Sequence, residues 1–151
     1  MKPMPLNRIT LALLYVCMAL GLLFVALLPR LLPQLLNTPG LLPEATAAYA
    51  VSLACWMLGS AGGLFILYTL SRMMHSLNAD PFIRKNVKRL RNMGLTALFM
   101  TALTLVVTAL YFRPTLLLVA TAELLCALFS LVLRGVFEKA VGYREENALT
   151  I

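Results

Sequence analysis

The amino-acid sequence predicts an all-α, polytopic membrane protein, a compact bundle of four transmembrane helices with helical cytoplasmic extensions. Three observations predict this fold class. Of the 151 residues, 61% are hydrophobic and 13% are charged, whereas soluble domains are roughly 45–50% apolar and about 25% charged. Four runs with almost no charge are long enough to cross a bilayer, which needs about 20 apolar residues in a helix. The basic residues cluster beside these runs in a pattern that orients them.

The first predicted span, residues 9–28, has no charged residue and follows Lys2 and Arg8. A secretion signal also begins with basic residues, but its apolar core is only about 7–15 residues long. Because this run is longer and no small-residue cleavage site precedes a soluble domain, we expect it to be retained as a helix. The proline-rich segment 30–44 is too apolar to float in water and too broken to span, so we expect it to lie along the outer interface.

The other three predicted spans are residues 45–71, 92–112 and 114–133, and only the last carries a charge, Glu123. Hydrocarbon offers no water to backbone groups, and the runs are rich in Leu and Ala without alternation. Both features favour helices over barrel strands. We therefore expect one four-helix domain over residues 1–151.

An even number of spans places both termini on one side of the membrane. Eleven of the thirteen basic residues then share that side: Lys2, Arg8, Arg72, Arg84, Lys85, Lys88, Arg89, Arg91, Arg134, Lys139 and Arg144. Only Arg30 and Arg113 lie opposite. Since positive charge is retained in the cytoplasm, we expect both termini to be cytoplasmic.

Small residues mark the faces on which the helices are expected to pack, because lipid is as apolar as leucine and close approach must supply the attraction. Gly59 and Gly63 form a GxxxG pair in the second span. We expect this pair to pack within the chain; the alternative is a homodimer contact. The third span has a small, weakly polar stripe: Gly94, Ala97, Thr101, Thr104 and Thr108.

Glu123 lies near the middle of its span, where a charged side chain costs about 3 kcal/mol on insertion scales. It should therefore face the bundle, where Thr101, Thr104 and Thr108 are the candidate polar neighbours. Two interpretations remain open. Glu123 is either a protonated acid hydrogen-bonded to a threonine, or the proton or cation site of a small transporter. We favour the first, because no second ionisable residue lies at the same depth.

No cofactor, metal or catalytic set is expected. Cys17, Cys55 and Cys126 all fall inside the spans, where small apolar packing is their ordinary role. His75 is the only histidine, so no metal-ligand constellation can be drawn from the sequence. Nucleophile–base pairs are also missing, and we therefore do not expect an enzyme.

Within the cytoplasmic hairpin, residues 72–91, Asp80 suits a helix N-cap and Pro81 the first helical position. We expect a helix that begins at Pro81 and continues into the third span. The fourth span should likewise continue into the tail, residues 134–151, until Gly142, since glycine commonly follows the end of a helix. The hairpin and tail would then pack as a small helical stub beneath the membrane.

Five basic residues of the hairpin and two acidic residues of the tail form the candidate contact surface: Arg84, Lys85, Lys88, Arg89, Arg91, Glu145 and Glu146. The simplest interpretation is that the basic cluster sets the topology and attracts anionic lipid headgroups, at about 1 kcal/mol per basic residue near the surface. Docking of an acidic cytoplasmic protein is the second. Direct nucleic-acid binding is not expected, because no recognition fold accompanies the charge and Phe82 is the only aromatic residue in the hairpin.

Two cytoplasmic segments are distinctive. One is Asp80-Pro81-Phe82 followed by Asn86-Val87-Lys88-Arg89-Leu90-Arg91 and Gly94, and the other is Arg144-Glu145-Glu146-Asn147-Ala148-Leu149-Thr150-Ile151. Together they resemble the bacterial membrane protein family catalogued as domain of unknown function 2975, which has a Pro-Phe and Asn-x-x-Arg-Leu-Arg hairpin and closes on Glu-Glu-Asn-Asp-Leu-Thr-Ile. Ala148 stands where that family has Asp, so no carboxylate role is expected at this position.

The resemblance implies a four-helix protein of the bacterial cytoplasmic membrane, of unestablished activity and often encoded beside a small helix-turn-helix regulator. The leading hypothesis is a non-enzymatic protein that docks a cytoplasmic regulatory partner, such as that regulator, through hairpin 72–91 and tail 143–151. The alternative is a small transporter or a proton- or cation-coupled membrane subunit that uses Glu123.

Overall fold

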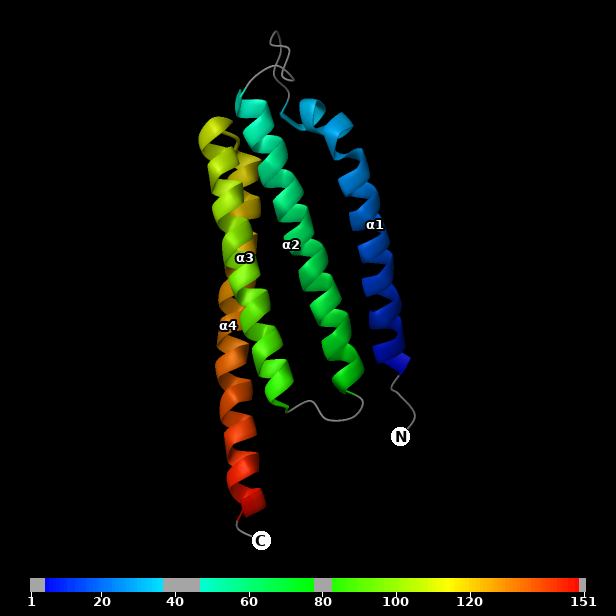
Figure 1. Ribbon diagram of the computed structural model, residues 1–151, viewed down its shortest axis with the longest axis vertical. Coiled ribbons are helices and arrows are strands. Elements are labelled where there is room, and N and C mark those ends of the chain that lie inside the picture. The colour runs from blue at the N-terminus through cyan, green and yellow to red at the C-terminus, as the bar shows by residue number, and fades with distance from the viewer. Residues whose placement is uncertain (1–4, 37–46, 78–82, 150–151) are drawn as a thin grey trace.

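A computed structural model describes residues 5–36, 47–77 and 83–149 of the chain. These residues form four long helices (Figure 1): α1 (Pro5–Leu36), α2 (Ala47–Leu77), α3 (Arg84–Leu110) and α4 (Pro114–Leu149). Each is long and apolar enough to cross a membrane. The predicted all-α fold with four spans is therefore confirmed.

The helices run alternately in opposite directions, and each packs beside the next in the chain (Figure 1). The contact between α3 and α4 is the most extensive of the three. The start of α1, the end of α2, the start of α3 and the end of α4 lie at the same end of the bundle. We call it the basic end, because ten of the twelve described Lys and Arg residues lie towards it: Arg8, Arg72, Arg84, Lys85, Lys88, Arg89, Arg91, Arg134, Lys139 and Arg144.

The bundle carries its large apolar side chains outside. Leu20, Leu118 and Phe129 are each well over half exposed, whereas small residues such as Ala97 and Ala127 are buried. A soluble monomer rarely exposes so much contiguous apolar surface. In a bilayer the same surface faces acyl chains, and the small residues allow the helices to approach one another. The distribution is that of a membrane protein.

Helix α1 extends eight residues beyond its predicted end at Leu28, although Pro29 and Pro33 lie inside it. The predicted break after Leu28 is therefore wrong for residues 29–36; residues 37–46 lie outside the described part of the chain. A proline inside a helix lacks an N–H, so Pro33 leaves the carbonyl of Pro29 without its usual partner. The Tyr49 hydroxyl at the start of α2 donates a hydrogen bond to this carbonyl oxygen at 3.3 Å. Neighbouring helices rescue prolines in membranes in this way.

The ends of the two helices at the basic end also differ from their predictions. Helix α3 begins at Arg84 rather than Pro81, and its N-cap residue is Ile83, whose backbone is extended (φ −117°, ψ 146°). Asp80 and Pro81 themselves lie outside the described residues. Helix α4 does not end at Gly142 but continues to Leu149. A glycine inside a helix costs only about 1 kcal/mol relative to alanine, so Gly142 does not force α4 to end.

Candidate functional site

A network of hydrogen bonds joins the end of α2 to the start of α3. Asn86 has no exposed surface, and its Nδ2 donates to Ser76 Oγ at 2.9 Å. Ser76 Oγ in turn donates to the Met73 carbonyl oxygen at 2.7 Å. The Arg89 Nη1 donates to Asn86 Oδ1 at 2.9 Å and to the Arg72 carbonyl oxygen at 3.2 Å. A fully bonded polar network of this kind fixes the relative position of two helices.

Apolar contacts support the same junction. Met73 of α2 and Leu90 and Met93 of α3 form a buried cluster, against which Leu133 and Phe137 of α4 pack. Three helices therefore meet on one small core at the basic end. The hydrogen bonds set the register between α2 and α3, and this core fixes α4 against both of them.

An ion pair joins the start of α3 to the last turns of α4. Arg84 Nε and Nη2 donate to Glu145 Oε1 and Oε2 at 2.8 and 2.5 Å, a two-pronged geometry. The hydrogen bonds and positive charge of Arg84 lower the pKa of the Glu145 carboxyl, and Glu145 raises the pKa of Arg84 in return. Both side chains are exposed to solvent. Because both charges are exposed, this pair joins the end of α4 to α3 but adds little to the stability of the fold.

Between these two helices runs a groove of about 600 Å³, which we call the basic-end groove. It is lined by one face of each helix: Arg84, Val87, Lys88 and Arg91 from α3, and Arg134, Glu138, Val141, Gly142 and Glu145 from α4. Arg134 pairs with Glu138 at 3.3 Å, one turn further along α4. Lys88 and Arg91 form no ion pair with any residue that the structure describes. The groove thus has two cations that its own acids do not neutralise.

The structure separates the seven residues of the predicted contact surface. Arg84, Lys88, Arg91 and Glu145 line the groove. Arg89 instead turns to α2 through its hydrogen bond to the Arg72 carbonyl, and Lys85 and Glu146 are exposed outside the groove lining.

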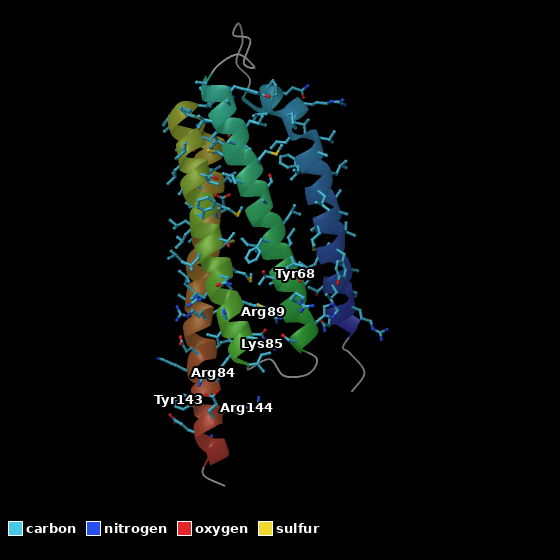
Figure 2. All side chains as sticks on the ribbon, in the orientation of Figure 1. Tyr68, Arg84, Lys85, Arg89, Tyr143 and Arg144 are labelled. Atoms are coloured by element: carbon cyan, nitrogen blue, oxygen red, sulfur yellow. The ribbon has the colours of Figure 1, made fainter. Side chains whose placement is uncertain are left out.

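Two features of this end were missed by sequence reasoning. Asn86 belongs to the hairpin motif that carried the family resemblance, but the motif did not reveal that the residue is buried. Tyr143, on α4, is 67% exposed. Figure 2 shows Arg84, Tyr143 and Arg144 gathered at the basic end. An exposed aromatic residue with arginines around it is typical of protein contact sites.

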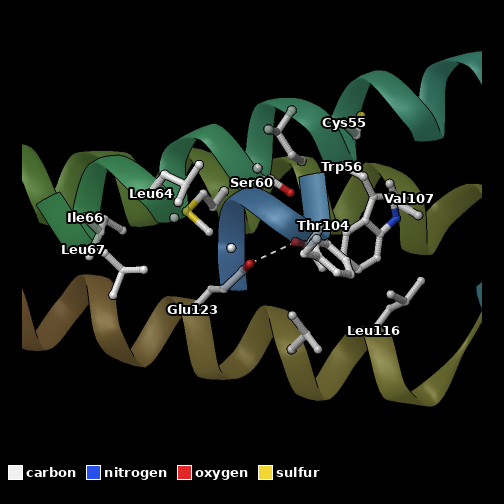
Figure 3. A pocket seen from close by; sticks show the side chains of 17 residues that line it. Cys55, Trp56, Ser60, Leu64, Ile66, Leu67, Thr104, Val107, Leu116 and Glu123 are labelled. Carbon is white, nitrogen blue, oxygen red and sulfur yellow. Dashed lines mark hydrogen bonds between the residues drawn. The ribbon is translucent and has the colours of Figure 1, made fainter. Parts of the chain in front are cut away.

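Farther into the bundle, Glu123 faces a cavity of about 440 Å³ to which all four helices contribute (Figure 3). Thr104 Oγ1 of α3 donates to Glu123 Oε2 at 2.8 Å. The other two candidate threonines do not reach the acid. Thr101 donates to the Ala97 carbonyl and Thr108 to the Thr104 carbonyl, each four residues back in its own helix.

Gly59 and Gly63 line this cavity rather than a helix contact. A Cβ atom at Gly59 would meet nothing within 4 Å, and one at Gly63 would meet only Met100 Cε at 3.9 Å. The pair therefore does not provide the close packing within the chain that we predicted; a homodimer contact stays a prediction. Among the glycines that the structure describes, Gly94 has the tightest surroundings, since a Cβ atom added there would lie 2.7 Å from Leu131 Cγ of α4.

The described residues contain no group of three or more His, Cys, Asp or Glu side chains that could hold a metal ion. Cys17, Cys55 and Cys126 are free thiols. His75 Nε2 lies 3.3 Å from the Tyr15 hydroxyl, which joins α2 to α1.

Comparison with known proteins gives a family without an assigned activity. No curated protein and no solved structure matches the chain. The model of a family of proteins of unknown function, DUF2975, matches residues 9–151. This range includes the basic-end groove, the cavity around Glu123 and all of the helices except the first turn of α1. The chain is thus a multi-pass membrane protein that belongs to the DUF2975 family.

Proposed function

We propose that the protein is a non-enzymatic docking partner in the bacterial cytoplasmic membrane. Its basic end faces the cytoplasm, and the basic-end groove binds an acidic segment of a cytoplasmic regulatory protein. The observation that carries this proposal is the pair of cations, Lys88 and Arg91, left without an ion pair by the described residues around them. The family resemblance favours a small helix-turn-helix regulator as the partner.

The charge distribution supports the orientation. Ten of the twelve described Lys and Arg residues lie towards one end of the bundle, whereas Arg30 and Arg113 lie towards the other. Loops that carry excess Lys and Arg stay in the cytoplasm during insertion. The groove would then open to cytoplasmic proteins.

The depth of the groove favours a protein over lipid headgroups as its occupant. Helix α4 rises about 46 Å from Pro114 to Glu145 at 1.5 Å per residue. The hydrocarbon core is only about 30 Å thick, and the bilayer with its headgroups about 40–45 Å. Headgroups can reach Arg91 and Arg134, but Arg84, Tyr143 and Glu145 lie at or beyond the headgroup layer. Tyrosine is common among the residues that become buried at the centre of a protein interface, and Tyr143 is exposed at a depth that a cytoplasmic protein can reach.

The groove is also held in shape before any partner arrives. Asn86 and Arg89 fix α3 against α2, and the buried apolar core at the basic end fixes α4 against both helices. A surface whose walls are already fixed loses little conformational entropy on binding. We therefore expect recognition to require the native bundle rather than the hairpin sequence alone.

Photo-crosslinking in living cells tests the proposal. A photoreactive amino acid replaces Tyr143 in the full-length protein, and adducts are identified by mass spectrometry. We expect one discrete adduct with a cytoplasmic protein. Lys88→Glu combined with Arg91→Glu should reduce it at least about tenfold, because a double charge reversal turns attraction of an acidic segment into repulsion.

The matched control is Lys85→Glu combined with Lys139→Glu, which changes the net charge equally outside the groove. It should leave the adduct intact. A discrete adduct that survives reversal of Lys88 and Arg91, or the absence of any protein adduct, contradicts the proposal. If the purified protein instead responds to anionic nanodiscs through Lys88 and Arg91 and gives no protein adduct, the groove is a lipid site.

A further inference from the structure

The cavity around Glu123 has the dimensions of a small-molecule site and is separate from the basic-end groove. Its volume of about 440 Å³ falls in the usual range for ligand pockets, about 300–1,000 Å³. Residues of all four helices line it, including Gly21 and Phe24 of α1 and Val119 of α4. Glu123 lies about 14 Å along α4 from Pro114, near the midplane of a hydrocarbon core about 30 Å thick. A ligand in this cavity would therefore lie at the depth of the lipid acyl chains.

The walls of the cavity are mainly apolar, and two of them are aromatic. Phe24 and Trp56 line it, together with leucines from α2, α3 and α4. In Figure 3, Trp56 and Leu64 of α2 and Leu116 of α4 surround the space beside Glu123. Aromatic faces attract organic cations as well as apolar groups, most strongly where water is excluded.

Glu123 is the only acidic or basic side chain among the residues that line the cavity. Thr104 donates a hydrogen bond to Oε2, and no described residue donates one to Oε1. A carboxylate at this depth is costly unless a proton or a cation neutralises it. The described lining contains no Lys, Arg or His side chain that could do so. A proton, or a cation that enters the cavity, must therefore neutralise Glu123.

We propose that this cavity binds a lipophilic organic cation, with its positive charge beside Glu123 and its apolar groups against Phe24 and Trp56. A metal ion does not fit, since Ca²⁺ takes about 6–8 oxygen ligands and the wall offers one carboxylate with three nearby hydroxyl or thiol groups at most. An anion of the same shape would be repelled. The proposal is independent of the docking function of the basic end.

The chain contains a single tryptophan, and that residue, Trp56, lines the cavity. Its fluorescence therefore reports on this site alone. The purified full-length protein in nanodiscs is titrated with tetraphenylphosphonium and, separately, with tetraphenylborate, an anion of the same shape. We expect a saturable change in Trp56 fluorescence with the cation and none with the anion.

Two variants locate the site. Glu123→Gln should weaken binding of tetraphenylphosphonium at least about tenfold, whereas Glu146→Gln, the same change outside the cavity, should leave it unchanged. Gly59→Leu keeps the carboxyl but places a side chain in the cavity, where a Cβ meets nothing within 4 Å. It should abolish binding, and Gly135→Leu, at a position equally open but outside the lining, should not.

The variants are compared only where their helical circular dichroism matches that of the native protein. If Glu123→Gln does not fold, the Gly59→Leu variant alone tests the proposal. Equal responses to the cation and the anion overturn the proposal. So does a folded Glu123→Gln or Gly59→Leu variant that binds tetraphenylphosphonium as the native protein does, or a native protein with no saturable response.

Discussion

Asn86 has no exposed surface, yet it lies in a hairpin where most neighbouring side chains are charged. A buried amide must find hydrogen-bond partners, and here the partners come from two places, Ser76 on α2 and Arg89 one turn later on α3. The residue types in the motif could be read from the sequence. The hydrogen-bond partners of Asn86 could not be predicted from the sequence, because they depend on how α2 and α3 are rotated against each other.

Glu123 is a second residue whose hydrogen-bond partner the sequence predicts only in part. Its depth and the threonine stripe on α3 predicted that a threonine would lie near the acid, and the structure places Thr104 in that position. The sequence could not single out Thr104 from Thr101 and Thr108, since all three lie on one face of the helix. The choice is made by the vertical register between α3 and α4, which a helical repeat does not encode.

The ion pair between Arg84 and Glu145 leads to a prediction about pH. Because Arg84 lowers the pKa of the Glu145 carboxyl, the attraction is complete above the ordinary glutamate pKa of about 4.3 and is lost as the pH falls through the lowered value. Carboxyl titration by ¹³C NMR in micelles should give Glu145 a pKa below the ordinary value. Arg84→Gln should raise it, and added salt should weaken the shift.

Lys85→Gln is the matched control, since it removes a neighbouring positive charge that is not paired with Glu145. The Glu145 titration curve should barely move in this variant. Identical curves for Arg84→Gln and Lys85→Gln would mean that the pair does not persist in solution.

At the scale of the helices, the spans were located well and their ends poorly. Pro29, Pro33 and Gly142 are local signals for a helix end, and all three lie inside helices. Tertiary contacts accompany two of these signals: Tyr49 donates to the carbonyl that Pro33 leaves free, and Glu145, three residues after Gly142, pairs with Arg84 of α3. These two contacts join residues 20 and 61 positions apart in the sequence, so a local pattern cannot predict them.

The packing of α3 on α4 depends on a glycine. At Gly94 a Cβ atom would lie 2.7 and 2.8 Å from Leu131 Cγ and Cδ2, and 3.2 Å from the Ala127 carbonyl oxygen. Gly94→Ala should therefore destabilise the bundle by about 1–3 kcal/mol, the usual cost of overpacking. Loss of helical circular dichroism on titration with a denaturing detergent checks this, and the midpoint should fall.

Gly135→Ala on α4 is the control, because a Cβ there meets nothing within 4 Å. It should leave the midpoint unchanged or raise it, since alanine favours a helix over glycine by up to about 1 kcal/mol. Equal midpoints for the two variants would show that α3 and α4 do not approach closely at Gly94.

At the scale of the whole molecule, the fold class and the number of spans followed from the sequence because they depend on summed hydrophobicity, which is a property of composition and length. The cavity around Glu123 and the basic-end groove did not. Each is a space left between side chains of several helices, and its existence depends on packing rather than on any one segment. The groove, moreover, includes Val141 and Gly142, to which the charge pattern gave no weight.

The central claim is that the chain crosses the membrane four times with its basic end in the cytoplasm, and topology reporters test it most directly. Green fluorescent protein, which folds in the cytoplasm, and alkaline phosphatase, which is active outside it, are fused in turn after Ile151 and between α1 and α2. We expect fluorescence without phosphatase activity at the C-terminus, and the reverse between α1 and α2. Phosphatase activity at the C-terminus, or the same signal at both positions, would contradict the account.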